Sequence, residues 1–113
     1  MGTYLAQPIT TKNTASDSNA LFAYGLATMQ GWRERNEDAH LAKLDIDGNQ
    51  TSLFAVFDGH GGSMIAWFCQ NHFTEVLINL DSYKKGEYQT ALEETFVEID
   101  YMLLSKEGQE EFK

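Results

Sequence analysis

One stretch of this chain, residues 53–62, constrains its fold more than any other. It opens with an apolar run at 53–57 and continues at 58–62 as Asp-Gly-His-Gly-Gly. A short apolar run bounded by turn residues is typical of a strand that is covered on both faces. Apolar residues then recur at helical spacing over 64–80, which predicts an amphipathic helix beginning after the glycines. The sequence therefore predicts a strand, a glycine-rich loop and a helix in succession.

A β-hairpin is predicted immediately before this junction. Residues 38–46 have the pattern of one strand and residues 52–57 that of the next, and Asp-Gly-Asn at 47–49 is a tight-turn signal. Antiparallel pairing brings the beginning of the first strand opposite the end of the second. We therefore expect Glu37 and Asp38 to lie near Asp58.

The meeting of these acids indicates a cation site. An ionised Asp58 at the mouth of an apolar strand is costly unless a positive partner lies beside it, and carboxylate oxygens are the ligands that hard divalent cations prefer. Arg33, just before Glu37 and Asp38, offers the planar donor fork that suits a phosphate oxyanion. The glycine loop adds an anion-favouring helix start. Together these features indicate metal-assisted phosphate chemistry.

The rest of the chain is read as one domain with a polar lead-in. Residues 1–20 are polar and contain the only proline, so we expect an extended or mobile segment ahead of a domain over 21–113. The remaining pattern predicts a strand at 21–29, a turn at 30–32, a break at 81–86 and a second helix at 88–103.

The charge balance argues against a nonspecific nucleic-acid surface. The chain has 17 acidic and 8 basic side chains, a net charge of −9, and no basic cluster to replace phosphate counterions. No stretch is apolar enough to span a membrane, and the N-terminus lacks the layout of a secretory signal.

Other features bear on the compartment. The lone Cys69 fits a reducing environment, which favours a cytosolic or nuclear protein. Met1-Gly2 leaves N-terminal myristoylation open, but the usual signal has Ser or Thr where this chain has Ala6, so the sequence does not support it.

The histidines have different expected roles. His60 in the glycine loop is either a general acid for a leaving group or a turn histidine exposed to water. His72 falls on the apolar face of the first helix and is expected to be a partly buried core residue. A zinc site built from His40, Cys69 and His72 matches no known spacing.

The combination of Gly-Trp-Arg at 31–33, Glu-Asp-Ala-His at 37–40 and Phe-Asp-Gly-His-Gly-Gly at 57–62 resembles the N-terminal part of the PP2C (PPM) family of metal-dependent serine/threonine protein phosphatases. The resemblance implies an α+β fold, a β-sandwich of two antiparallel sheets flanked by helices, of which only the hairpin strands and two helices are present here. It also implies two Mn²⁺ or Mg²⁺ ions at one end of the sandwich.

The resemblance assigns metal roles to the acidic residues. Asp58 would bridge the two ions, Gly59 would offer its carbonyl oxygen, and Glu37 and Asp38 would hold one ion directly or through water. Arg33 would bind the phosphate of a phosphorylated protein substrate.

The same resemblance completes the expected reaction. His60 would protonate the departing Ser or Thr oxygen while an activated water attacks phosphorus in line. The family also uses aspartates from later in its domain, so we expect this chain to be a fragment that is inactive or weakly active alone and prone to self-association. The alternative is a noncatalytic, phosphatase-like module that associates with another chain.

Overall fold

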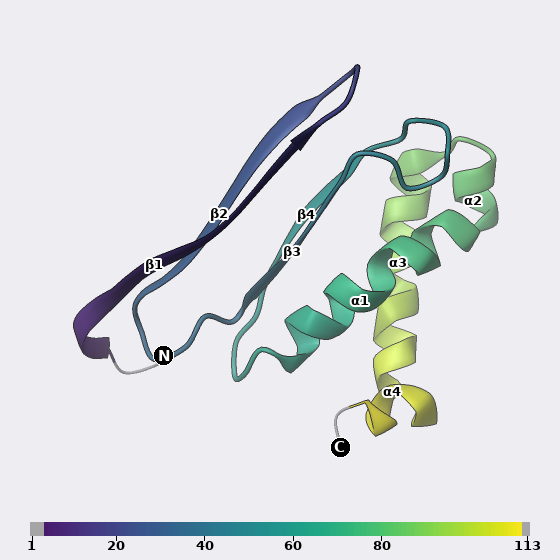
Figure 1. Cartoon of the computed structure of the whole chain (residues 1–113). Helices are drawn as coiled ribbons and strands as arrows, with labels where there is room; N and C mark the ends of the chain where they lie inside the picture. Colours follow the sequence, from purple (N-terminus) through teal and green to yellow (C-terminus); the bar gives the residue numbers. More distant parts are fainter. Residues whose placement is uncertain (1–3, 112–113) are drawn as a thin grey trace. The chain divides into compact units, whose positions relative to one another are not determined.

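The computed structural model describes residues 4–111 and divides the chain into two compact units, residues 1–63 and 64–113. Met1 and Gly2, on which the myristoylation question depends, lie outside the described residues. The first unit is built from strands and the second from helices (Figure 1), so the fold class is α+β as predicted. The strands are β1 (Tyr4–Ser18), β2 (Ala23–Arg33), β3 (Asp38–Lys43) and β4 (Leu53–Asp58); the helices are α1 (Met64–Asn79), α2 (Asp81–Lys84), α3 (Tyr88–Leu104) and α4 (Lys106–Glu110).

Strands β1 and β2 form a long two-stranded antiparallel ribbon (Figure 1). The segment expected to be extended or mobile is therefore extended over most of its length. The prediction of a turn at 30–32 is wrong, because β2 continues to Arg33. Gly31 has a φ of 67° and lies opposite Ile9, where the strand register shifts. A glycine with positive φ is typical of a β-bulge, and this one lets the strand carry Arg33 to its end.

Strands β3 and β4 form the predicted antiparallel hairpin, with Asp38 opposite Asp58 and Lys43 opposite Leu53. Strand β3 ends earlier than residue 46 because the connection is a wider loop than a tight turn. The Asp45 carboxylate accepts hydrogen bonds from the amides of Asp47 and Gly48, at 3.2 and 2.8 Å. Such side-chain bonds compete with strand pairing.

The expectation that β4 is covered on both faces is wrong for this chain. Half-buried side chains alternate with exposed ones along the strand, and Phe54 and Val56 are 49% and 73% exposed. The Phe54 ring meets the edge of the Tyr24 ring of β2 at a centroid distance of 5.7 Å. One face of the hairpin therefore presents apolar surface.

The helical unit has its own core. Phe73 and Leu77 of α1 and Ala91, Thr95 and Ile99 of α3 are all buried. Both predicted helices are present at nearly the expected bounds. The predicted break holds the single turn α2, and the charged end holds the short α4.

His72 of α1 is partly buried, as predicted. Its imidazole lies against the Phe68 ring, and its Nε2 is 2.8 Å from a carboxylate oxygen of Glu111. Within residues 4–111 we find no helix with the length and apolar character needed to cross a bilayer.

Candidate functional site

The centre of the candidate site is a pair of opposed carboxylates. Asp38 begins β3 and Asp58 ends β4, and the hairpin register places them directly opposite each other. The pKa of the Asp38 carboxyl is raised by partial loss of water, by the charge of Asp58 and by a hydrogen bond with the Asp58 side chain; Arg33 opposes this rise. Like charges directly opposite in a sheet are destabilising. A bound cation would remove this repulsion.

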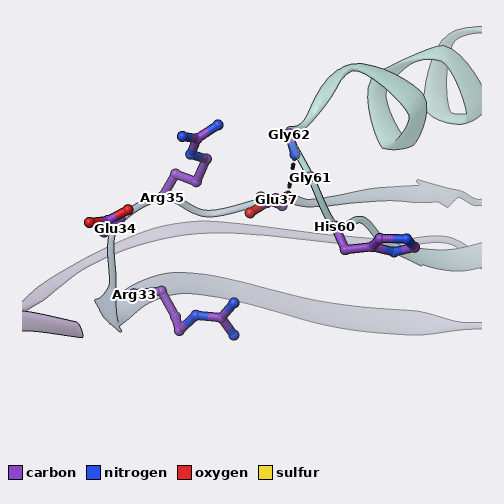
Figure 2. Close-up of a pocket in the computed structure, with 7 residues that line it drawn as sticks. All are labelled: Arg33, Glu34, Arg35, Glu37, His60, Gly61 and Gly62. Atoms are coloured by element: carbon purple, nitrogen blue, oxygen red, sulfur yellow. Dashed lines mark hydrogen bonds between the residues drawn. The ribbon is translucent and has the colours of Figure 1, made fainter. Parts of the chain in front are cut away.

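Glu37 ties the glycine loop to the start of β3. Its backbone carbonyl accepts a hydrogen bond from the Gly59 amide at 3.2 Å, and its carboxylate accepts one from the Gly62 amide at 2.6 Å (Figure 2). Gly61 and Gly62 have φ angles of 72° and 127°, a backbone region that favours glycine. The loop between β4 and α1 is therefore held at both ends by one residue.

The oxygen donors of this corner suit a hard divalent cation, although they are fewer than expected. Among residues 4–111, no three His, Cys, Asp or Glu side chains are close enough to hold a metal ion together. Of the three carboxylates expected to meet, those of Asp38 and Asp58 lie opposite each other, whereas the Glu37 carboxylate accepts a hydrogen bond from the Gly62 amide. Paired carboxylates are typical ligands of Mg²⁺, which keeps several waters. The described part of the chain also holds no such cluster for a zinc site built from His40, Cys69 and His72.

Two adjacent hollows share one wall, formed by Arg33, Arg35 and Glu37. One hollow, of about 230 Å³, contains Asp38 and Asp58. The other, of about 370 Å³, contains His60 and the glycines of the loop. A phosphate anion bound at this shared wall would have the carboxylate pair on one side and the glycine loop on the other.

Arg33 and His60 approach the larger hollow from different elements. Arg33 stands at the end of β2, and His60 extends from the loop after β4 (Figure 2). Both side chains are exposed, so a ligand from solvent can reach them. Gly59 lines the smaller hollow beside Asp58.

Asn36 is a site residue that the sequence analysis did not single out. Its side-chain amide donates to the Thr28 hydroxyl of β2 at 2.8 Å, and its carbonyl oxygen accepts from the Asp38 amide at 3.1 Å. It therefore joins β2 to the first residue of β3. The signal in the sequence was an Asn two residues before the predicted strand start at 38, because in an Asx turn the Asn side chain accepts from the backbone amide two residues on.

We expect Asn36→Ala to loosen Asp38 because both hydrogen bonds are lost. Each such bond contributes about 1 kcal/mol, so the free energy of unfolding should fall by about 1 to 2 kcal/mol. Removal of a group that orients a ligand lowers metal affinity by about tenfold or more. Urea unfolding and Mn²⁺ titration measure the two effects.

Thr28→Val is the matched partner, since it removes the hydroxyl that Asn36 binds. In a double-mutant cycle the effects of the two substitutions on the free energy of unfolding and on Mn²⁺ affinity should be coupled. Additive effects on Mn²⁺ affinity would show that the Asn36–Thr28 bond does not position Asp38.

The comparisons with known proteins agree on one family. A family model described as Protein phosphatase 2C matches residues 22–112. The chain is 48% identical over 111 residues to "Probable protein phosphatase 2C 5" of Paramecium tetraurelia, covering 98% of this chain and 37% of that protein. It is 43% identical over 108 residues to "Probable protein phosphatase 2C 21" of Arabidopsis thaliana, covering 96% of this chain and 30% of that protein.

A relative from Drosophila melanogaster, "Probable protein phosphatase CG10417", is 46% identical over 104 residues, which cover 92% of this chain and 16% of that protein. The chain therefore belongs to the protein phosphatase 2C family. It spans about a third or less of the length of these curated relatives. Its strands and helices are those of a partial fold of this family.

Proposed function

We propose that these residues form one side of the active site of a metal-dependent phosphatase that hydrolyses phosphoserine and phosphothreonine in proteins. The single observation that carries the proposal is the opposed pair Asp38 and Asp58. Two like charges facing each other cost stability, and a divalent cation is the partner that makes the arrangement favourable. Membership of the protein phosphatase 2C family supports the reaction class.

In this proposal the chain's acids hold the cations. Asp58 and Asp38 contribute carboxylate oxygens, Gly59 contributes its carbonyl oxygen, and Glu37 acts through a water because its carboxylate binds the Gly62 amide. When bound, Mn²⁺ or Mg²⁺ lowers the pKa of a water and neutralises charge on the phosphoryl group.

The remaining roles belong to Arg33 and His60. The Arg33 guanidinium binds two phosphate oxygens with parallel hydrogen bonds and orients phosphorus. His60 donates a proton to the Ser or Thr oxygen as that oxygen leaves, so that the product is a neutral hydroxyl. Both side chains line the hollow beside the glycine loop.

The test is phosphate release from a phosphothreonine peptide by a protein that contains this chain within a whole phosphatase domain. We expect no turnover after EDTA treatment and recovery on titration with Mn²⁺ or Mg²⁺. His60→Gln should lower kcat more for a peptide substrate than for p-nitrophenyl phosphate, because p-nitrophenolate leaves without a proton. Turnover that survives EDTA would contradict the proposal.

A noncatalytic interaction module is the second candidate, favoured by the exposed apolar side chains Phe54 and Val56. An exposed apolar patch marks an association surface or an aggregation-prone one. This reading predicts a discrete complex in sedimentation velocity and no metal-dependent turnover in the same assay. Phosphate release that depends on the metal would exclude it.

A further inference from the structure

A second arginine, Arg35, occupies the same wall as Arg33. It lies in the segment between β2 and β3, and it lines both the hollow with the acid pair and the hollow with the glycine loop. Figure 2 shows the two guanidinium groups directed to different sides of the loop segment that carries Glu37. Because both arginines line the larger hollow, they offer two separate donor groups to a ligand that occupies it.

Arg35 is available for binding. Within the part of the chain that the structure describes, its guanidinium has no ion-pair partner, and its side chain is exposed. The neighbouring Glu37 carboxylate is engaged by the Gly62 amide. The chain has only 8 basic side chains against 17 acidic ones, and two of those basic side chains, Arg33 and Arg35, line the larger hollow together with Glu34 and Glu37.

One phosphoryl group does not need both arginines. A single guanidinium already satisfies two phosphate oxygens in a bidentate contact. The larger hollow, of about 370 Å³, falls in the size range of pockets that take whole small ligands. It therefore has room for a side chain next to the phosphorylated residue as well as for the phosphoryl group.

We propose that Arg35 is a specificity-determining residue that binds a second anionic group on the substrate, next to the phosphorylated Ser or Thr. The preferred substrate class is then a phosphopeptide with an acidic or a second phosphorylated residue adjacent to the scissile phosphate. This inference rests on the proposed function of the site.

The test compares matched phosphothreonine peptides whose neighbouring residues are glutamine, aspartate or phosphoserine, on either side of the phosphothreonine. The wild-type protein, as a whole phosphatase domain, should have a kcat/KM about tenfold higher for the anionic neighbours, the size expected of one charge-assisted contact. Arg35→Gln should reduce that preference to within about twofold, because it lowers kcat/KM more for the anionic peptides than for the glutamine peptide. Comparison of the aspartate and phosphoserine peptides shows whether the second anionic group that Arg35 binds is a carboxylate or a phosphate.

Lys43→Gln is the matched control, because it removes one exposed positive charge from the far end of β3 and outside both hollows. It should keep the tenfold preference. Arg35→Lys should keep part of it, since the charge remains but the planar donor fork does not. Thermal unfolding checks that all variants are equally folded.

Binding without turnover separates this inference from the proposed function. In metal-free buffer, fluorescence anisotropy should show the doubly phosphorylated peptide binding about tenfold more tightly than the singly phosphorylated one, and Arg35→Gln should abolish the difference. If that difference is present while no peptide is hydrolysed, the inference stands and the proposed function fails. If Arg35→Gln weakens all peptides equally, or changes nothing, the inference is wrong whatever the turnover.

Discussion

Asp58→Asn is expected to lower metal-dependent turnover by about 1,000-fold and, at the same time, to stabilise the metal-free protein. The first effect follows because a carboxylate that holds the cations supports several kcal/mol of transition-state stabilisation, and each 1.36 kcal/mol is a factor of ten in rate. The second follows because Asp38 no longer faces a like charge across the hairpin. Relief of such a pair is worth a few tenths to about 1 kcal/mol.

Two measurements check this pair of effects: phosphate release at saturating Mn²⁺, and urea unfolding in EDTA. Asp45→Asn is the control. It removes one negative charge from the other end of the hairpin, and its amide oxygen can still accept the hydrogen bonds from Asp47 and Gly48. It should leave turnover unchanged. An Asp58→Asn protein that is as active as the wild type, or less stable than it in EDTA, would contradict the account.

Arg33→Ala is expected to lower kcat/KM by about 10- to 100-fold, the second largest effect. Hydrogen bonds to charged groups contribute about 1.5 to 3 kcal/mol, and the loss removes a bidentate contact to the phosphate. Arg33 also lowers the pKa of Asp38. Without it, that pKa should rise further, so that higher pH is needed to ionise Asp38 and the loss of activity should be greatest at acid pH.

Arg33→Lys distinguishes charge from geometry. It should restore the acid-side activity, because a positive charge near Asp38 returns, and should recover only part of the phosphate binding, because an ammonium lacks the planar fork. The pH profile of kcat/KM gives both results. Equal losses at all pH values in the two variants would show that Arg33 does not act on Asp38.

The sequence predicted the hairpin, and with it the approach of Asp38 to Asp58, because strand alternation and turn chemistry are local signals. Once residues 38–43 and 53–58 pair antiparallel, Asp38 must face Asp58. The helix after the glycines was equally predictable, since its apolar side chains recur over several turns. The proposed metal, phosphate and acid roles of these residues remain proposals.

Other features depend on contacts between segments that local patterns do not encode. Strand β1 is largely exposed and mostly polar after Ile9, and it exists as half of a ribbon with β2. The glycine at 31 was read as a turn signal, whereas the structure uses its positive φ for a bulge inside a strand. Asn36 was missed because its partner, Thr28, belongs to a different strand.

The central claim is that Asp38 and Asp58 share a divalent cation, and Mn²⁺ binding to this chain tests it most directly. Electron paramagnetic resonance gives the free Mn²⁺, and paramagnetic broadening in NMR spectra locates the bound ion. We expect the amides of residues 37–39 and 57–59 to broaden first, and Asp38→Asn and Asp58→Asn each to weaken binding by about tenfold or more. Equal Mn²⁺ affinity in the wild type and both variants, or broadening confined to the helical unit, would contradict the claim.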